Sequence, residues 1–485
     1  MAAKEFIVAI ELGSSKMTGI AGKKNLDGSI TVHAIVKEDS SSFIQKGVVY
    51  NIDKTAQCIT TIINKLSTKL KTRINMIYVG IGGQSIRSIL NVVPKDLASP
   101  TQITQDIIDE MSDTNRNMNY PDQTILDVAI QEYLVDNQLQ TDPVGVQCTK
   151  LEGNYLNILQ RKAFYEKLYS CLEKAGVTLA DIYLAPLMLA DAVLTETERR
   201  SGCALVDIGA STTTVSVYSK NILRHLAVIP LGSNNITKDI ATSLNIEESE
   251  AERLKLKYAS AYTEYKDIEQ GQTIVIDADH NVEEKKFVDI VEGRIQEIVE
   301  NVLYQIPQHY ANNLLGGIII TGGGSNIPNI DKAFTIDHQH IEKIRIARTI
   351  TATVKPMPSD IKKIDDGTLC TVLGLLAKGD RNCAGNEMSD NPGIFDTQET
   401  HTDTNINSHD ARDPKPFGVI DNKIEEERKK EEERKREEER RKEEERQEKL
   451  REEEEKRKRR ENSPLNKGLR GIKGFLKSMI KPDEE

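Results

Sequence analysis

The stretch Ala9-Ile-Glu-Leu-Gly13-Ser-Ser-Lys16 decides the fold of this chain, because it joins two predicted strands through a short polar loop. Gly13 lets the turn close tightly. The N–H and hydroxyl groups of Ser14 and Ser15 can face phosphate oxygens, and Lys16 supplies positive charge. Taken alone, the stretch also fits an ordinary Gly-Ser turn between two hairpin strands, which is the commoner arrangement.

The same design recurs at Val206-Asp-Ile-Gly209-Ala-Ser-Thr212. In both places a carboxylate, Glu11 or Asp207, ends a strand and precedes an apolar residue, a glycine and hydroxyl side chains. Two such loops can hold the phosphates of a nucleotide from opposite sides, with the carboxylates organising hydrated Mg²⁺. The alternative for Glu11 is a solvent-facing residue at a strand end. The residues expected to contact phosphate in the second loop are Gly209, Ala210, Ser211 and Thr212.

A third loop, Ile320-Thr-Gly-Gly-Gly324-Ser-Asn, ends another predicted strand with three glycines. The absence of side chains at Gly322, Gly323 and Gly324 allows backbone to approach a flat ligand closely. The three loops therefore predict one nucleotide site assembled from distant parts of the chain.

Short apolar strands alternate with amphipathic helices through residues 1–380, which predicts an α/β fold. One helix face is marked by apolar residues between positions 56 and 70. The predicted strands are rich in β-branched residues and comprise Phe6–Ile10, Ile30–Val36, Met76–Gly80, Ala204–Ile208, Thr212–Tyr218 and Ile318–Thr321.

The chain has 485 residues and a formal net charge of −11. Its acidic body disfavours nucleic acid as a partner, because neutralising phosphates requires a basic face. The six cysteines are widely spaced without a C-x-x-C pair, which indicates reduced thiols in the cytosol. No signal peptide is expected at the N-terminus, and no apolar run reaches the roughly 18–20 residues that span a bilayer.

After about residue 380 the composition changes. Residues 381–422 are polar and poor in apolar side chains, which predicts a disordered linker. In 423–461, acidic triplets alternate with basic ones, so opposite charges meet at i+3 and i+4 along a solvated helix. A disordered polyampholyte is the alternative. A coiled coil is disfavoured because apolar a and d positions are lacking.

The last segment, 463–481, predicts a cationic amphipathic helix that lies in the interface of an anionic membrane. A final core helix of a globular domain is the alternative. Lys473 and Lys477 belong to the polar face. The predicted apolar face consists of Leu465, Leu469, Ile472, Phe475, Leu476, Met479 and Ile480.

In order, the three loops resemble the phosphate-1, phosphate-2 and adenosine motifs of the actin, Hsp70 and hexokinase superfamily. Two further segments make the resemblance more specific to one family. Ala185–Glu196 is similar to the hinge helix before phosphate-2, and Leu231–Asp239 with Ala251–Lys255 is similar to the entry into the upper subdomain of the FtsA family. With the amphipathic tail, the resemblance to FtsA covers residues 1–380 and the last twenty.

This resemblance implies an actin-like, two-lobed ATPase fold with an inserted subdomain 1C. Lobe 1 (subdomain 1A) would comprise 1–83 and 161–200, and subdomain 1C would comprise 84–160. Lobe 2 (subdomain 2A) would comprise 201–232 and 313–380, with subdomain 2B at 233–312.

The resemblance also implies a function. Family members bind ATP and Mg²⁺ and polymerise. They attach to the cytoplasmic side of the inner membrane through the tail and recruit FtsZ during septum formation. Glu252 and Lys255 would contact the adenosine, and Arg294 would contact the C-terminal peptide of FtsZ. For Arg294 the alternative is an ordinary surface residue. Other division proteins would bind subdomain 1C.

The sequence departs from the family pattern at four positions in or near the loops. Glu11 stands where an Asp is usual, Ala210 and Ser211 replace glycines, and Ser233 replaces another glycine. Binding tolerates these changes because the N–H donors remain, whereas hydrolysis depends on sub-ångström positioning. At most a weak ATPase is expected, with no catalytic residue assigned. A metabolic kinase and a pilus-assembly actin homologue remain alternatives on the same fold.

Overall fold

The computed structural model describes residues 5–264, 272–276, 281–336, 343–355 and 366–387, all of which belong to one compact unit. Most of the expected linker 381–422, all of the charged spacer 423–461 and the predicted membrane helix 463–481 lie outside the described residues. The strands and helices expected within residues 1–380 are present, with ends that differ by one to four residues.

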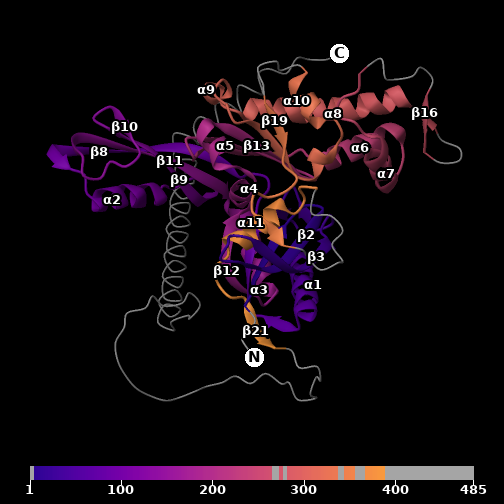
Figure 1. The fold of residues 1–485 in the computed structure, drawn as a ribbon, viewed down its shortest axis with the longest axis horizontal. Coiled ribbons are helices and arrows are strands. Elements are labelled where there is room, and N and C mark those ends of the chain that lie inside the picture. Colours follow the sequence, from indigo (N-terminus) through magenta and orange to yellow (C-terminus); the bar gives the residue numbers. More distant parts are fainter. Residues whose placement is uncertain (1–4, 265–271, 277–280, 337–342, 356–365, 388–485) are drawn as a thin grey trace, which may run out of the picture. The chain divides into compact units, whose positions relative to one another are not determined.

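The first lobe is built on a sheet with the order β12-β7-β1-β2-β3-β20 (Figure 1). β1, β2 and β3 are antiparallel neighbours, whereas β1, β7 and β12 run parallel. Five of the six β1 residues are buried, as expected for a central strand whose two faces are both covered. The strands are β1 (Ile7–Leu12), β2 (Lys16–Lys24), β3 (Ile30–Asp39), β7 (Met76–Ile81), β12 (Thr178–Leu184) and β20 (Val354–Lys355).

The second lobe repeats this arrangement. In the order β15-β14-β13-β18-β19, the first three strands are antiparallel and the last three are parallel. Each lobe therefore contains the same five-stranded unit, which confirms a duplicated α/β core. The strands are β13 (Cys203–Ile208), β14 (Thr213–Ser219), β15 (Ile222–Ile229), β18 (Gly317–Thr321) and β19 (Ile344–Ile346).

The inserted segment forms one end of a nine-stranded sheet, in the order β10-β9-β11-β8, with α2 packed on β8 and β11. A separate apolar core that includes Val93, Leu151 and Tyr155 lies within it. One residue pair, Arg87 with Ala227 of β15, continues this sheet into the second lobe. The elements are β8 (Arg87–Gln102), α2 (Gln105–Arg116), β9 (Gln123–Val135), β10 (Gln138–Gln140) and β11 (Gln147–Arg161).

Helices cover both lobe sheets. α1 (Ile52–Leu70) begins at Asn51, whose side chain accepts the Lys54 N–H, and it packs against β2, β3 and α3 (Lys162–Lys174). The hinge region comprises α4 (Ala185–Val193) and α5 (Glu196–Ser201), where Thr195 and Glu198 form a capping box. Residues 233–312, which are expected to form subdomain 2B, contain α6 (Ser233–Leu244), α7 (Glu248–Tyr258), β16 (Thr273–Val275), β17 (Asn281–Glu283), α8 (Glu284–Gln305) and α9 (Gln308–Ala311).

One expected boundary is wrong. Residues 313–380 are expected to belong as a whole to the second lobe, but β20 pairs with β3 of the first sheet, and α11 (Cys370–Lys378) packs on β1, β2, β7 and α4 of the first lobe. The reason is steric fit. A Cβ at Gly374 would lie 2.3 Å from the Met188 carbonyl oxygen, and a Cβ at Gly80 would lie 2.4 Å from a Leu375 methyl. Only glycines at these positions allow so close an approach.

The chain that follows α11 forms hydrogen bonds with residues of the first lobe. The Tyr78 hydroxyl donates to the Asp380 carboxylate at 2.7 Å and accepts the N–H groups of Asp380 and Arg381. Cys383 donates its N–H to the Phe6 carbonyl. β21 (Ala384–Glu387) then pairs with β6 (Thr72–Ile74). We call residues 379–387 the exit strap.

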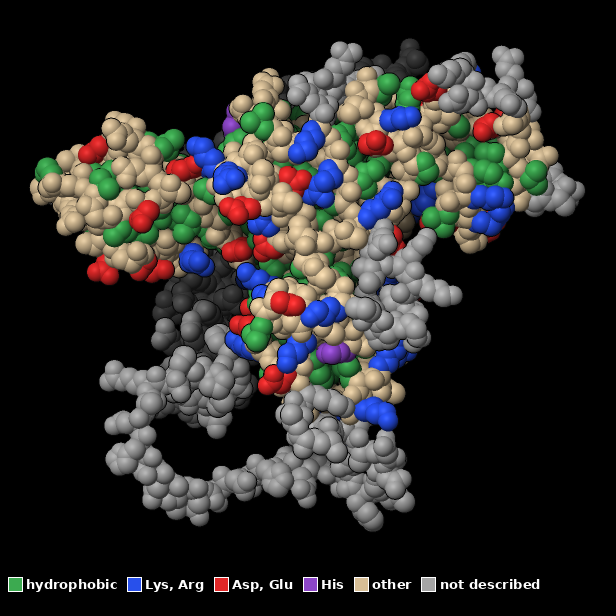
Figure 2. Space-filling model, in the orientation of Figure 1, with side chains coloured by type: hydrophobic (Ala, Val, Ile, Leu, Met, Phe, Trp, Pro, Cys, Tyr) green, Lys and Arg blue, Asp and Glu red, His purple; other side chains and the backbone are tan. Residues whose placement is uncertain are grey.

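The surface of the body is mixed in charge. On the face that Figure 2 presents, basic and acidic side chains lie side by side, and neither sign forms a continuous area. Among the described residues, no helix is both long and apolar enough to cross a bilayer.

The contact between α11 and α4 gives a stability prediction. Gly374→Ala should lower the free energy of unfolding by about 1–3 kcal/mol, because the new methyl group collides with backbone and forces the helices apart. Gly293→Ala in α8 is the matched control. Its Cβ meets no described atom within 4 Å, so better helix propensity should stabilise by about 0.5–1 kcal/mol. Denaturant unfolding that showed equal stabilisation by both changes would refute the packing argument.

Candidate functional site

A cleft of about 950 Å³ lies between the two repeated sheets, and the three loops predicted from the sequence line it. Of the predicted residues, only Ser211 of the second loop is not among its lining. The predicted residues that line it are Glu11, Gly13, Ser14, Ser15, Lys16, Asp207, Gly209, Ala210, Thr212, Glu252, Lys255, Gly322, Gly323 and Gly324.

The duplication of the sheet places Glu11 and Asp207 at equivalent points. Each is the penultimate residue of its strand, and each pairs with a threonine of the next antiparallel strand, Thr18 or Thr214. Both threonines also line the cleft. The two carboxylates thus face the same space because the two lobes have the same strand register.

The first loop is fixed by β3 and the turn after it. The Ser40 hydroxyl donates to the Gly13 carbonyl at 2.6 Å, and the Gly47 N–H donates to the Ser14 hydroxyl oxygen at 2.7 Å. A Cβ at Gly13 would lie 2.4 Å from the Lys16 carbonyl oxygen, so the tight turn requires glycine. Because Ser14 accepts from Gly47, its own hydroxyl proton remains available to a ligand.

The second loop is fixed by the first turn of α6. Ser233 and Asn234 donate their N–H groups to the carbonyls of Gly209 and Ala210, at 3.0 and 2.7 Å. In a trans peptide the N–H points opposite to the C=O, so the N–H groups of Ala210 and Ser211 are directed away from α6. This orientation leaves both N–H groups free of α6 although Ala210 and Ser211 carry side chains.

The third loop closes against the end of β13. Gly322 has a φ of +84°, and a Cβ there would lie 2.3 Å from an Asp207 carboxylate oxygen. A Cβ at Gly324 would lie 2.3 Å from an Ile208 methyl group. The glycines therefore bring this loop next to the Asp207 carboxylate.

The α6–α7 wall of the cleft contains a buried cation. The Lys255 ammonium lies 2.6 Å from a Glu252 carboxylate oxygen and donates to the Thr237 hydroxyl at 2.8 Å. Thr237 in turn donates to the same Glu252 oxygen. Lys255, only 7% exposed, thus holds the wall together and positions Glu252 toward the ligand space.

The environment of the cleft raises the pKa of both carboxyl groups. Burial and the negative charge of Asp207 raise the pKa of Glu11 to about 8, although a hydrogen bond from Thr371 and the charge of Lys37 oppose this. Burial raises the pKa of Asp207 to about 6. Such a pair favours a bound cation. The described residues contain no cluster of three or more metal-ligating side chains, so Mg²⁺ fits only as an ion held largely by water and phosphate.

Among the lining residues that sequence reasoning did not find are Lys37 and Thr371. Lys37 pairs with Thr18, which pairs with Glu11, so the three form a row across β3, β2 and β1. Thr371 reaches Glu11 from the start of α11. Only the strand register and the return of α11 bring Lys37 and Thr371 to the cleft, and the local sequence gave no signal for either.

Comparison with known proteins agrees with this geometry. A family model described as "Cell division protein FtsA" matches residues 204–374, and one described as "SHS2 domain inserted in FTSA" matches residues 83–159. The chain is 32% identical to the cell division protein FtsA of Neisseria meningitidis over 382 residues, which covers 77% of this chain and 90% of that protein. This chain belongs to the FtsA family.

A second relative supports the assignment. FtsA of Porphyromonas gingivalis is 31% identical over 327 residues, which covers 66% of this chain and 68% of the relative. FtsA is a cell-division protein, so the metabolic kinase considered above is not supported.

Among solved structures, a chain of the "PilM-PilN type IV pilus biogenesis complex" superposes with a TM-score of 0.52 at 15% identity. The match covers 76% of this chain and 97% of that one. It confirms the actin-like architecture and shows the fold alone.

The pair of carboxylates predicts a pH dependence. In the unfolded chain Glu11 titrates near 4.5, but in the fold its pKa is about 8. Between these values the folded state holds a proton that the unfolded state has lost. The ligand-free protein should therefore lose stability as pH rises, by at most about 1.4 kcal/mol per pH unit from this group.

Glu11→Gln cannot titrate and should show a smaller loss between about pH 5.5 and about pH 7.5, measured by denaturant unfolding. An identical pH dependence in the two proteins would mean that Glu11 is solvated as an ordinary surface carboxylate.

Asp207→Asn should weaken nucleotide binding in the presence of Mg²⁺ by about tenfold to a hundredfold, because it removes a charge that orders the hydrated ion. In chelator, without Mg²⁺, the same variant should bind ATP at least as well as wild type, because it no longer repels phosphate. Titration calorimetry under the two conditions checks both statements. Equal affinity with Mg²⁺ would disprove the assignment of Asp207.

Proposed function

We propose that this FtsA-family chain binds ATP with Mg²⁺ in the cleft, polymerises, and tethers FtsZ filaments to the cytoplasmic face of the inner membrane at the division site. The observation that carries the nucleotide part is the cleft itself. The ends of β1 and β13 each bring one carboxylate and one predicted phosphate loop to the cleft. The loop Gly322–Gly324 lies beside them.

Different residues of the cleft would contact different parts of the nucleotide. The loops at Gly13 and Gly209 would hold phosphates through N–H and hydroxyl groups, with Lys16 and Lys37 adding positive charge. Glu252 and the Gly322–Gly324 loop would hold the adenosine. Glu11 and Asp207 would hold hydrated Mg²⁺, which would supply positive charge to the phosphates and to the two carboxylates. Any hydrolysis is proposed to be slow, and no catalytic residue is assigned.

The FtsZ part of the proposal rests on a second, smaller hollow of about 280 Å³ between α6 and α8. Arg294, on α8, lies in it and is held by Asp239 of α6, with Nε 2.5 Å and Nη2 3.1 Å from the two carboxylate oxygens. Arg294 also contacts Glu297. The hollow is further lined by Ser243, Ile290 and Gly293. The hollow thus has charged and polar residues around the Ile290 side chain and around the helix backbone at Gly293. Such a surface suits a short peptide.

The membrane part rests on sequence, because 463–481 lies outside the described residues. A direct test is flotation with vesicles of phosphatidylcholine and phosphatidylglycerol, using the full chain and a chain lacking 463–485, each with ATP and FtsZ. The full chain should carry FtsZ to the vesicles, and the truncated chain should not. Flotation of FtsZ with the truncated chain would disprove tethering through the tail.

Arg294→Gln should weaken binding of the C-terminal peptide of FtsZ by about tenfold, because a charge-assisted contact is worth roughly 1.5–3 kcal/mol. Arg253→Gln is the matched control, since Arg253 is also a partly exposed arginine paired with an acid three residues away, Glu250. Fluorescence anisotropy with labelled peptide measures both. Equal affinities in the two variants would show that the hollow is not the peptide site.

Phe475→Glu combined with Leu476→Glu should abolish flotation, because it places charge in the centre of the apolar face. Lys473→Gln with Lys477→Gln should only weaken it, by about 1 kcal/mol per lysine near an anionic surface. Because one tail binds weakly, conditions that prevent polymerisation should also reduce flotation, through lost avidity. A Glu double variant that floats like wild type would exclude this helix as the anchor.

A further inference from the structure

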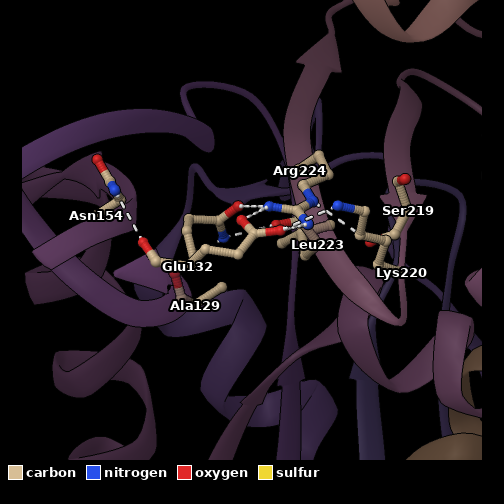
Figure 3. A network of polar contacts seen from close by, with 8 residues as sticks. Ala129, Glu132, Asn154, Ser219, Lys220, Leu223 and Arg224 are labelled. Carbon is tan, nitrogen blue, oxygen red and sulfur yellow. Dashed lines mark hydrogen bonds and ion pairs between the residues drawn. The ribbon is translucent and has the colours of Figure 1, made fainter. Parts of the chain in front are cut away.

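The inserted subdomain, residues 84–160, is attached to both lobes. Its covalent connections enter the first lobe, where Gly83 packs against Gly47 and the Arg161 N–H donates to the Ser85 hydroxyl at 3.3 Å. Its polar anchor is on the second lobe, at the start of β15 (Figure 3). This double attachment gives the subdomain a mechanical role that the order of segments along the chain does not suggest.

The anchor is a shielded, two-point ion pair. The Arg224 guanidinium of β15 donates to both carboxylate oxygens of Glu132 on β9, at 2.5 and 2.6 Å, and to the side-chain oxygen of Gln131 at 3.0 Å. The side chains of Arg224 and Glu132 are only 7% and 16% exposed. Figure 3 shows the guanidinium and the carboxylate facing each other edge to edge, the geometry that fixes orientation most strongly.

Two further bonds reinforce this anchor. The Gln131 side chain donates to the Leu223 carbonyl at 2.9 Å, and the Leu226 N–H donates to the Ser88 hydroxyl at 2.8 Å. Together with the pair of Arg87 and Ala227, they bind two strands of the subdomain, β8 and β9, to one strand of the second lobe. We call this set of contacts the β15 clamp.

The ion pair of the β15 clamp lies near the turn of the β14–β15 hairpin, the contacts of Leu226 and Ala227 lie farther along β15, and the cleft lies at the opposite end of the hairpin. The hairpin turns at Lys220 and Asn221, which both have positive φ, and there the Ser219 carbonyl accepts from Arg224 at 3.3 Å. At the opposite end, β14 starts directly after the phosphate loop. β15 leads to Gly232, where an added Cβ would lie 2.7 Å from the carbonyl oxygens of Gly209 and Ala210.

The β14–β15 hairpin is thus a stiff two-stranded element about seven residues, or roughly 23 Å, long. If a nucleotide draws the Gly13 and Gly209 loops together, the hairpin must move with the second lobe. The β15 clamp then transmits this movement to the inserted subdomain, whose two chain connections stay in the first lobe. We propose that the β14–β15 hairpin and its clamp turn the inserted subdomain relative to the first lobe when nucleotide closes the cleft. This inference rests on the proposed nucleotide binding.

The consequence would be regulation of the surface that the subdomain offers to partners. Several apolar side chains there are well exposed, including Leu90, Val92 and Leu139. Their position relative to the first lobe would differ between the nucleotide-bound and empty states, so a partner that contacts both would distinguish the two states.

The chain is well suited to a distance measurement. All six native cysteines are buried, so spin labels can be directed to exposed positions. Leu26→Cys reports on the first lobe, Leu139→Cys on the inserted subdomain and Leu315→Cys on the second lobe; all three native side chains are at least 66% exposed. Double electron–electron resonance on the full chain measures the 26–139 and 26–315 distances, with and without ATP and Mg²⁺.

In wild type, ATP should shift both distances. In Arg224→Lys, which loses the two-point contact, and in Glu132→Gln, which keeps the side-chain size, the 26–315 shift should persist and the 26–139 shift should fall by at least half. Lys220→Met is the matched control: Lys220 lies 3.9 Å from Glu132 but is 74% exposed. This control should behave as wild type.

Two results would overturn the inference while leaving nucleotide binding intact. One is a 26–315 shift in wild type without a 26–139 shift. The other is a full 26–139 shift in both clamp variants. If ATP shifts neither distance and calorimetry shows no binding, the proposed nucleotide function fails together with the inference. Hydrogen exchange of β8 and β11 verifies that each variant remains folded.

Discussion

The burial of Glu11 and Asp207 in one cleft is the constraint around which this body is organised, because it raises the pKa of both carboxyl groups. Two copies of one five-stranded unit end their central strands at the same register, so two carboxylates come to one partly buried space. Neither can ionise there at little cost without a positive partner. Lys37, the Thr371 hydroxyl and the neighbouring loops reduce the cost, and a hydrated cation with phosphates would remove it. The repeated sheet thus brings together two carboxylates whose ionisation a positively charged ligand would favour.

The parts of this site that the sequence predicted are those encoded locally. A strand, a carboxylate, a glycine and hydroxyl residues lie within eight positions, and each has its own physical reason to be there. Lys37 and Thr371 were not predicted as site residues. Lys37 reaches the cleft because β3 pairs with β2, and Thr371 reaches it because α11 returns to the first lobe. Spacing along the chain carries no information about such contacts.

The same distinction explains the domain boundaries. The inserted subdomain was recognisable as a segment, but its attachment to β15 was not, because Arg224 and Glu132 are 92 residues apart and each resembles an ordinary surface charge in the sequence. Likewise Lys255 was expected to touch ligand, whereas its ammonium is engaged by Glu252 and Thr237. In this protein several cations are positioning groups that hold elements together.

The exit strap determines where tension enters the protein. A pull on the chain beyond Glu387 is resisted first by the pairing of β21 with β6, and then by the bonds around Tyr78 and Phe6. These residues belong to or adjoin β7 and β1, two central strands of the first sheet. A load on the chain beyond Glu387 would therefore reach the first sheet without passing through the second lobe.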